Sequence, residues 1–354
     1  MDQWITTSEA AARLGVKRGT LYSYVSRGVL DSRRQPGQSE SLFDRTQIDS
    51  LAVAKHDGRR AGDRLLRFRA VSTRVSSISN GRLCLRGRDI ADVCAEMDFD
   101  AAARFVLDVD EPCPVPAVDR SVVAGVEMER RIPLTVALMA AVDPLRVERV
   151  DAPARVLGLL PTLAHAVPEI DFVHPWVNLL ATTLIDNGLA ASTTAARVAA
   201  STRAGVFDAL LAGYAALSGP LHGGAPATAF DLVDAVVGGT PVDRAVADAV
   251  VDGRLPGFGH VVYQGADPRA QLVLDRVRRD APGSAALAAA DQIMARASRP
   301  ANIDLASAVV ARELGLDSRA GEVLFQYGRT VGMAAHIVEE YGEAPLRWRG
   351  SNSG

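Results

Sequence analysis

The spacing of apolar residues along most of this chain is that of amphipathic helices. One helix face is preceded by acidic residues and contains Phe99, Ala102, Ala103, Val106 and Leu107. Another contains Leu287, Ala290, Met294 and Ala297. Steps of three and four residues place side chains on one side of a helix. Few alternating or β-branched runs occur after residue 90, so we expect an all-α body with at most a short strand pair near Val71 to Leu85.

The first 55 residues have a pattern of their own, with two short helices separated by a tight turn. Thr6 and Glu9 have the spacing of a capping box, in which each side chain bonds the other residue's backbone N–H. Two apolar helix faces follow: Ala10, Ala11 and Leu14, then Leu21, Tyr24 and Val25. Gly15 and Gly28 stand where these two helices are expected to end.

The next segments predict a small hairpin and a third helix. VLDSRR and SLFD are strand candidates on either side of the turn sequence QPGQSE, and RTQIDSLAVAK has helical character. The complete order is that of a winged helix-turn-helix. TSEAAARLGV followed by RGTLYSYVSRGVL resembles the DNA-binding heads of MerR-like and excisionase-like proteins. We therefore assign residues 1–58 to such a domain and residues 59–65 to a linker.

The resemblance implies that the second helix of this head enters the major groove of duplex DNA. It would present five candidate contacts: Lys17, Arg18, Thr20, Tyr22 and Arg27. Residues 1–60 hold ten Lys and Arg against seven Asp and Glu, a net charge of +3 in a chain whose net charge is −3. This asymmetry has the sign that DNA binding needs. The alternatives are a solvated basic helix on an accessory domain and a protein-interaction module.

The composition narrows the class of protein. A chain of 354 residues, 48% of them hydrophobic, is large enough for two or three domains. Its three cysteines are odd in number and lack zinc spacing, so we expect reduced thiols in a cytoplasmic protein. The first residues do not have the pattern of a signal peptide. The longest strongly apolar stretch, Leu134 to Val142, is about half a membrane span.

Three short segments combine glycine and proline with a side chain that can act as an acid or a base. GPLHGGA contains His222, PGFGHVVYQGADPRA contains His260 and Arg269, and RPANIDLASAVV contains Asp304. Glycines beside a histidine allow a ligand to approach closely. Singly, each has an ordinary explanation: a core or surface histidine, or, for Asp304, a helix N-cap. Three other histidines lack such surroundings and are interpreted as structural: His165, His174 and His336.

Together and in this order, these segments resemble the citrate synthase family. GRLCLRGRDIADV and FQYGRTVGMAAHIVEE resemble two further segments of that family, so the likeness spans roughly residues 66–350. It implies an all-α fold in which two helical domains close over the substrates, a homodimer, and no metal or prosthetic group. The domains implied are a large one of residues 66–218 and 311–354 and a small one of residues 219–310.

The resemblance also implies the chemistry. Condensing an acyl-CoA with a 2-oxo acid needs a base for the thioester methyl group and donors to both carbonyl oxygens. By position, Asp304 matches the base, His222 the donor to the thioester and His260 the donor to the ketone. The matching substrate contacts are Arg269 and Arg329 for carboxylates, Phe325 beside the oxo acid, and Arg347 or Arg349 from across the dimer interface.

Two segments depart from the family pattern. LIDNGLAAST stands where the family usually has ADHELNAST, so Asn187 replaces a histidine that contacts the oxo acid. Asn187 is shorter and cannot carry positive charge. Val261 and Gln264 occupy positions where basic residues that contact coenzyme A phosphates are common. These departures put the identity of the substrates in question.

Two functions therefore follow from the sequence. The first is an enzyme that condenses acetyl-CoA, or propionyl-CoA, with oxaloacetate or a related 2-oxo acid. The alternative is a metabolite-sensing DNA-binding regulator, built on a citrate synthase body with weak or no catalysis. The retained acid–base residues favour the enzyme, whereas Asn187 and the N-terminal head favour the regulator.

Overall fold

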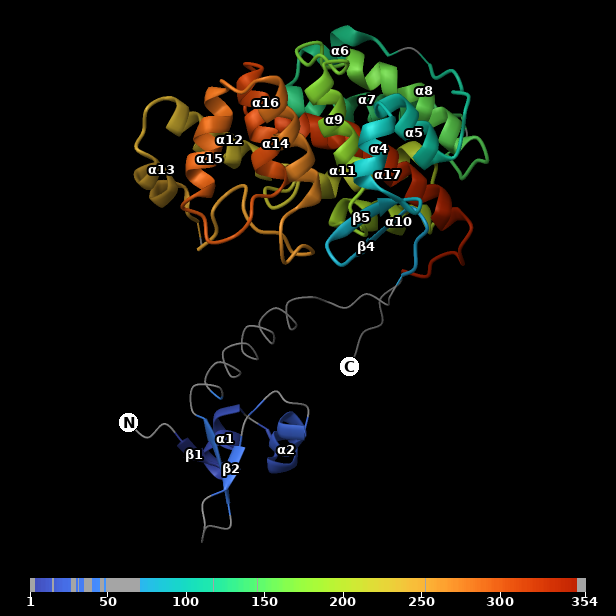
Figure 1. Cartoon of the computed structure of the whole chain (residues 1–354). Helices are drawn as coiled ribbons and strands as arrows, with labels where there is room; N and C mark the ends of the chain where they lie inside the picture. Colours follow the sequence, from blue (N-terminus) through green and yellow to red (C-terminus); the bar gives the residue numbers. More distant parts are fainter. Residues whose placement is uncertain are drawn as a thin grey trace. The chain divides into compact units, whose positions relative to one another are not determined.

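The computed structural model describes residues 4–14, 16–26, 30, 32–34, 40–44, 48, 71–116, 118–144, 146–251 and 253–348. By its contacts, the chain divides into two compact units, Met1–Ser72 and Thr73–Gly354 (Figure 1). Each has a core of its own. We call them the head and the body.

The head combines two helices with a three-stranded antiparallel sheet. Its elements are β1 (Trp4–Thr6), α1 (Thr7–Leu14), α2 (Arg18–Ser26), β2 (Ser32–Arg34) and β3 (Ser41–Asp44). The strand order is β1-β3-β2, so the predicted hairpin is confirmed as β2 and β3. Strand β1 was not predicted, because three residues are too few to show an alternating pattern.

The predicted capping box at the start of α1 is confirmed. The backbone N–H of Thr6 donates to Glu9 Oε2 at 3.0 Å, and the N–H of Glu9 donates to Thr6 Oγ1 at 3.2 Å. The core of the head is built from Ile5, Ala10, Leu14, Leu21, Leu30, Phe43 and Ile48. Gly15, Gly28, Arg27 and, apart from Ile48, the predicted third helix lie outside the described residues.

The body is almost entirely helical, as predicted. Its strands are β4 (Ser76–Ser79), β5 (Arg82–Leu85) and β6 (Arg88–Asp89), and β4 and β5 form the expected hairpin. Its helices are α4 (Ile90–Glu96), α5 (Phe99–Leu107), α6 (Arg120–Ala124), α7 (Met128–Val142), α8 (Ala152–His165), α9 (Pro175–Leu184), α10 (Ala191–Ala200), α11 (Val206–Leu217), α12 (Ala225–Val237), α13 (Val242–Ala249), α14 (Pro268–Asp280), α15 (Ala285–Met294), α16 (Ile303–Glu313) and α17 (Ala320–Tyr341). All five residues of the face predicted for α5 are buried.

Helix α17 runs through the centre of the body and is buried on nearly every side (Figure 1). Glycines allow its backbone to lie directly against the end of α9. A methyl group at Gly328 would come within 2.5 Å of the carbonyl oxygen of Ala181, and one at Gly332 would overlap the carbonyl oxygen of Ile185. This close approach places Arg329, between the two glycines, beside the turn that follows α9.

Helices α12 to α16 lie together on one side of the body in Figure 1. They comprise most of the predicted small domain, residues 219–310. Their contacts join them to the other body helices in one compact unit, so a division into two moving domains stays a prediction. Among the described residues, no helix is both long enough and apolar enough to cross a bilayer.

Candidate active site

The loop that carries His260 is fastened to the segment that begins α16. The N–H of Asn302 donates to the carbonyl of Gly257 at 2.9 Å, and the N–H of Gly259 donates to that of Pro300 at 2.8 Å. The side chain of Asn302 adds a third bond, from Nδ2 to the carbonyl of Gly259 at 3.0 Å. Because these three hydrogen bonds hold residues 257–260 against Pro300 and Asn302, His260 lies near the start of the helix that carries Asp304.

Two glycines of this loop are required by backbone conformation and by space. Gly257 has φ +83° and Gly259 has φ +75°, in the region that other residues rarely adopt. A methyl group at Gly259 would lie 2.8 Å from Arg299 Cδ, and one at Gly257 would lie 3.0 Å from Leu305 Cβ. The GFGH sequence is therefore needed to bring the histidine loop against α16.

Asp267 links two helix starts. It is the N-cap of α14, and its Oδ1 accepts from the backbone N–H of Arg269 at 3.0 Å. The Arg269 guanidinium binds both of its oxygens, from Nε at 3.0 Å and from Nη2 at 2.7 Å. Its Oδ2 also accepts from the N–H of Ile303 at 3.1 Å. Asp267 thus orients Arg269 and ties α14 to the first turn of α16.

Asp304 lies in the first turn of α16. The N-cap is Asn302, whose Oδ1 accepts from the N–H of Asp304 at 3.0 Å, so the interpretation of Asp304 as an N-cap is wrong. Burial raises the pKa of the Asp304 carboxyl to about 6; the nearby Arg269 charge opposes this shift and Asp267 reinforces it. A carboxylate with this pKa is a stronger base than an exposed aspartate and is still largely ionised at neutral pH.

His260 is held as a neutral donor. The backbone N–H of Val262 donates to its Nδ1 at 3.0 Å, which leaves the ring proton on Nε2. Burial and the Arg269 charge lower the pKa of His260, favouring this uncharged form. Its Nε2 lies 3.4 Å from Asn187 Nδ2 and 3.5 Å from Arg269 Nη2. The N–H groups of His260, Asn187 and Arg269 therefore converge on one place, where they could donate hydrogen bonds to a negatively polarised oxygen.

Tyr263 sets the orientation of Asn187. Its hydroxyl donates to Asn187 Oδ1 at 2.5 Å, so the amide nitrogen faces His260. The Tyr263 ring lies 4.9 Å from the His260 ring, and burial raises the pKa of its hydroxyl to about 12, so the group stays protonated. Tyr263 was not among the site residues predicted from the sequence, although it stands within the PGFGHVVYQGADPRA segment.

His222 reaches the site from the turn before α12. Its Nε2 lies 2.8 Å from Ser192 Oγ of α10, a contact that the sequence did not reveal. Its ring meets Phe325 edge-on, with centroids 5.2 Å apart. Burial, with the Arg329 charge, lowers the pKa of His222 to about 4, so the ring is neutral at pH 7.

Arg329 is a buried cation with hydrogen-bonding capacity to spare. Only 1% of the residue is exposed, and its Nε donates to the carbonyl of Leu184 at 3.1 Å. Its Nη1 has no hydrogen-bond partner among the described residues, and its guanidinium lies 5.1 Å from the Phe325 ring centre. Burial, with Arg269 adding to it, lowers its pKa to about 10, which leaves it charged at neutral pH. A buried, incompletely paired guanidinium is suited to a carboxylate ligand.

The structure thus brings together seven of the residues expected to catalyse or to bind substrate: His222, His260, Asp304, Arg269, Arg329, Asn187 and Phe325. Arg347 has other contacts. Its guanidinium binds Glu340 of the same chain, at 2.6 Å from Nε and 2.7 Å from Nη2. Arg349 lies outside the described residues.

In the head, the candidate DNA contacts gather around the start of α2. Lys17 precedes the helix and is exposed, as is Tyr22, which touches Phe43 edge-on. Arg18 is exposed as well, and its Nη2 lies 2.6 Å from Ser8 Oγ and 3.3 Å from Glu40. Thr20 is partly exposed.

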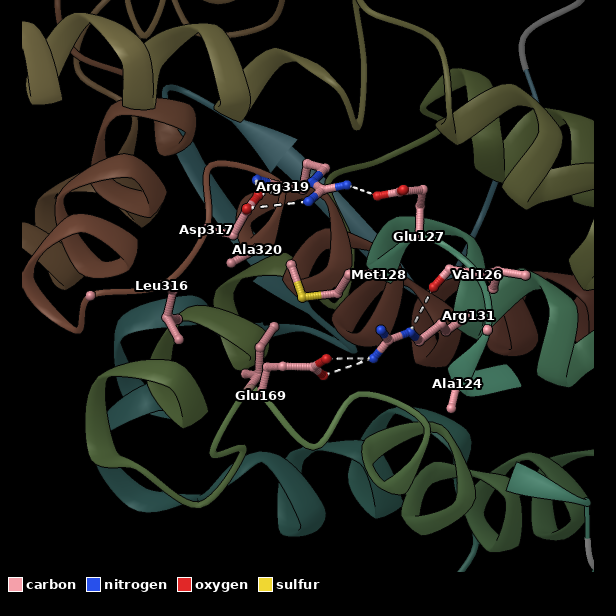
Figure 2. A pocket seen from close by; sticks show the side chains of 13 residues that line it. Ala124, Val126, Glu127, Met128, Arg131, Glu169, Leu316, Asp317, Arg319 and Ala320 are labelled. Carbon is pink, nitrogen blue, oxygen red and sulfur yellow. Dashed lines mark hydrogen bonds and ion pairs between the residues drawn. The ribbon is translucent and has the colours of Figure 1, made fainter. Parts of the chain in front are cut away.

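A pocket of about 470 Å³ lies elsewhere in the body, and Figure 2 shows the residues that line it. Its charged side chains pair with one another: Arg131 binds both oxygens of Glu169, and Arg319 binds Asp317 and Glu127. None of the candidate catalytic or substrate-binding residues described above lines this pocket. Within the described ranges, no three His, Cys, Asp or Glu residues are grouped as a metal ion would need.

Two family models match the chain. The model "Citrate synthase, C-terminal domain" matches residues 135–349, and "Helix-turn-helix domain" matches residues 4–52. A citrate synthase of Saccharolobus solfataricus is 38% identical over 168 residues, and citrate synthase 2 of Bacillus subtilis is 32% identical over 166. Each alignment covers 44% of this chain and 44% of the relative, so the match spans less than half of either relative's length.

Solved structures share the fold. Citrate synthase from Thermotoga maritima superposes with a TM-score of 0.65 at 20% identity, covering 80% of this chain and 93% of that one. The ternary complex of carboxymethyl coenzyme A and oxaloacetate with citrate synthase from Thermoplasma acidophilum gives 0.67 at 21% identity, covering 84% and 96%.

Proposed function

The chain belongs to the citrate synthase family, and we propose that its body condenses an acyl-CoA with a 2-oxo dicarboxylic acid. The proposed substrates are acetyl-CoA, or propionyl-CoA, and oxaloacetate or a related acid. A carbon–carbon bond forms between the thioester's α-carbon and the ketone carbon. Water then hydrolyses the thioester, releasing coenzyme A and a citrate-type product. The Thermoplasma acidophilum relative was solved with oxaloacetate and a coenzyme A derivative, which supports this choice of substrates.

On the acyl-CoA side, the proposal gives Asp304 the role of base. Its raised pKa suits it to accept a proton from the thioester's α-carbon. Neutral His222 would donate to the thioester oxygen as negative charge develops there. In this role His222 would carry its ring proton on Nδ1, and its Nε2 would accept a hydrogen bond from the Ser192 hydroxyl, 2.8 Å away. Fixed donors at a developing oxyanion typically contribute about 100- to 1000-fold in rate.

On the oxo-acid side, one observation carries the proposal: N–H donors gather at His260 Nε2, and the buried Nη1 of nearby Arg329 has no hydrogen-bond partner in the described part of the chain. His260 would polarise the ketone and then protonate its oxygen. Arg329 and Arg269 would bind the carboxylates, since guanidinium groups match them in geometry and charge. The Phe325 ring contacts His222 edge-on and lies close to the Arg329 guanidinium, where it would border the acid.

Two departures bear on which substrates are preferred. Asn187 supplies a neutral donor where the family has a histidine, so its hydrogen bond to the acid would be weaker than a charged one. Val261, which stands where a basic residue is common, is 90% exposed. An apolar residue there offers nothing to a coenzyme A phosphate. Asn187 and Val261 would therefore tune affinity without removing the acid–base groups.

The deciding experiment is release of free thiol from acetyl-CoA and propionyl-CoA with a panel of 2-oxo acids. Oxaloacetate is expected to support steady thiol release, and product analysis should show the matching tricarboxylate. Absence of thiol release with every acid, while oxaloacetate still binds, would overturn the catalytic proposal and favour the sensor.

Further parts of the proposal concern assembly and location. We propose a cytoplasmic homodimer whose two body domains close over the substrates without a metal or prosthetic group. Arg347 reaching a partner's site would require its ion pairs with Glu340 to break. Replacing Arg347 with alanine and measuring both the oligomeric state and the KM for oxaloacetate would test that role.

A second candidate function rests on the head. Its match to the helix-turn-helix model, and the exposed Lys17 and Arg18 at the start of α2, support duplex DNA as a partner. The alternative for the whole chain is then a regulator whose body senses a metabolite. Fluorescence polarisation with genomic fragments at about 50 mM salt, with and without oxaloacetate, would test this. Lack of salt-sensitive binding would exclude it.

A further inference from the structure

A chain of buried charged and polar side chains lies behind the candidate site, and no step of the proposed reaction uses it. Asp186, Arg197, His336 and Glu340 have no measurable exposure. They come from the turn after α9, from α10 and from the second half of α17. Ionised groups at this depth are costly unless they are paired, so the pattern of pairing needs an explanation.

The hydrogen bonds determine the tautomer of His336. Arg197 Nη1 lies 3.0 Å from His336 Nδ1, and a guanidinium can only donate, so Nδ1 is the acceptor. The ring proton is therefore on Nε2, which lies 3.1 Å from Asp186 Oδ2. Arg197 is itself held by Glu340, from Nε at 2.8 Å. His336 is thus fixed as a donor to Asp186.

Ser76 of β4 is a second donor to the same carboxylate oxygen. Its Oγ donates to Asp186 Oδ2 and accepts from the N–H of Gly188 at 3.2 Å. Oδ1 of Asp186, by contrast, is buried without a hydrogen-bond partner among the described residues. Both donors therefore act on one oxygen and hold the carboxylate turned toward β4 and His336.

Asp186 also lies beside the part of α17 that carries Arg329. A methyl group at Gly332 would lie 3.1 Å from Asp186 Cβ, and Arg329 Nε donates to the carbonyl of Leu184, two residues before Asp186. Burial raises the pKa of Asp186, but His336, Arg329 and Ser76 outweigh it and hold the pKa below its ordinary value. Arg329 and His336 are seven residues apart on α17 and so share one face of the helix. Within the described part of the chain, no hydrogen bond joins Asp186 to Arg329, even though each has an unpartnered buried atom, Oδ1 and Nη1.

On the basis of the proposed function, we propose that His336 and Ser76 are positioning residues that keep the Asp186 carboxylate away from Arg329. Arg329 Nη1 then stays free for the carboxylate of the 2-oxo acid. A buried carboxylate released from these donors would pair with the nearby guanidinium, because opposite charges attract strongly where water is excluded. The oxo acid would have to displace it before binding.

The test uses the full chain with Ser76→Ala as the main variant. Loss of this donor should raise the KM for oxaloacetate, and the Kd measured by calorimetry, by about tenfold, the size of one charge-assisted hydrogen bond. The KM for acetyl-CoA and kcat at saturating oxaloacetate should change little. His336→Gln keeps a donor for Asp186 and an acceptor for Arg197, so it should bind oxaloacetate within about twofold of wild type.

The double variant Ser76→Ala with Asp186→Asn separates this mechanism from simple loss of structure. A neutral amide cannot form an ion pair with Arg329, so the double variant should recover wild-type affinity for oxaloacetate. Ser201→Ala is the matched control. It removes a buried hydroxyl that donates to the carbonyl of Val198, and it should leave affinity unchanged.

Three results would overturn the inference: unchanged oxaloacetate affinity in Ser76→Ala, an equal loss in Ser201→Ala, or no recovery in the double variant. Binding of oxaloacetate without thiol release would refute the proposed catalysis and leave this inference standing. Failure of the wild-type protein to bind oxaloacetate at all would refute both.

Discussion

Replacing Asp304 with asparagine is expected to stop turnover and to stabilise the fold. Burial raises the pKa of this carboxyl from 3.8 to about 6. Because the folded pKa lies above the unfolded one, ionisation costs stability: the cost is absent below about pH 4, grows as the pH rises through 6, and is complete above it. About two pKa units correspond to roughly 3 kcal/mol at pH 8, an upper figure for what the neutral amide regains.

The same variant should lose catalytic activity, although it gains stability. An amide cannot accept the α-proton, and loss of a positioned base typically costs about 100- to 10,000-fold in rate. Wild-type kcat should likewise fall below about pH 6, where Asp304 becomes protonated. Thiol release measures the rate, and circular dichroism melts at pH 8 and pH 4 measure stability. A gain of roughly 5–10 °C in Tm is expected at pH 8 and little at pH 4.

Asp317→Asn is the matched control, because the same replacement of aspartate by asparagine should there lower the stability of the fold and not raise it. Hydrogen bonds from Arg319 hold the pKa of Asp317 at about 2, so its charge stabilises the fold at neutral pH and its removal should lower Tm. Turnover should be unaffected. Asp304→Ala is a second variant of the same position, because an introduced asparagine can deamidate back to the acid and alanine cannot. Near wild-type turnover in Asp304→Asn, or a lower Tm at pH 8, would refute the reasoning.

Three further predictions concern other residues. His222→Ala and His260→Ala should each lower kcat by about 100- to 1000-fold in the thiol assay, and a loss under tenfold would argue against a role as oxyanion donor. Asn187→His should lower the KM for oxaloacetate by about tenfold, because a charged donor binds a carboxylate more strongly; an unchanged KM would mean a pocket built around asparagine. Joint replacement of Arg18 and Arg27 with alanine should weaken DNA binding and flatten its salt dependence in polarisation titrations, without affecting thiol release.

Helices were the most predictable part of the fold. The apolar face of α5 repeats over nine residues, and all five of its predicted members are buried. Thr6 and Glu9 likewise encode their capping box within four residues of sequence. Strand β1 is too short to show a period, and the residues of β3 that pair with it lie 36 to 40 positions later in the chain. Local patterns therefore predict local structure, whereas a three-residue strand depends on a distant partner.

The candidate site shows the same division. Its acid–base residues stand in motifs that the sequence shows directly. In the structure His222 and His260 both lie near Arg329, and His260 and Asp304 both lie near Arg269. Ser192 and Tyr263 were missed, because serine on a helix and tyrosine in a loop are ordinary until the segments meet. Asp304 was weighed as an N-cap, but Asn302, two residues earlier, takes that position. The carboxylate is thereby left free for chemistry.

Burial, rather than residue type, is what suits Arg329 to the proposed binding of an anion. On an exposed helix the same arginine would be a hydrated surface cation of little consequence. Here Gly328 and Gly332 allow α17 to lie against the end of α9, which shields the guanidinium and gives its Nε one carbonyl partner. In the ranges that the structure describes, Nη1 has no hydrogen-bond partner and is buried, so a carboxylate ligand would gain more there than at the surface. Under the proposals made above, the glycines of α17 and the donors to Asp186 act together: the glycines allow Arg329 to be buried, and the donors keep the Asp186 carboxylate away from its guanidinium.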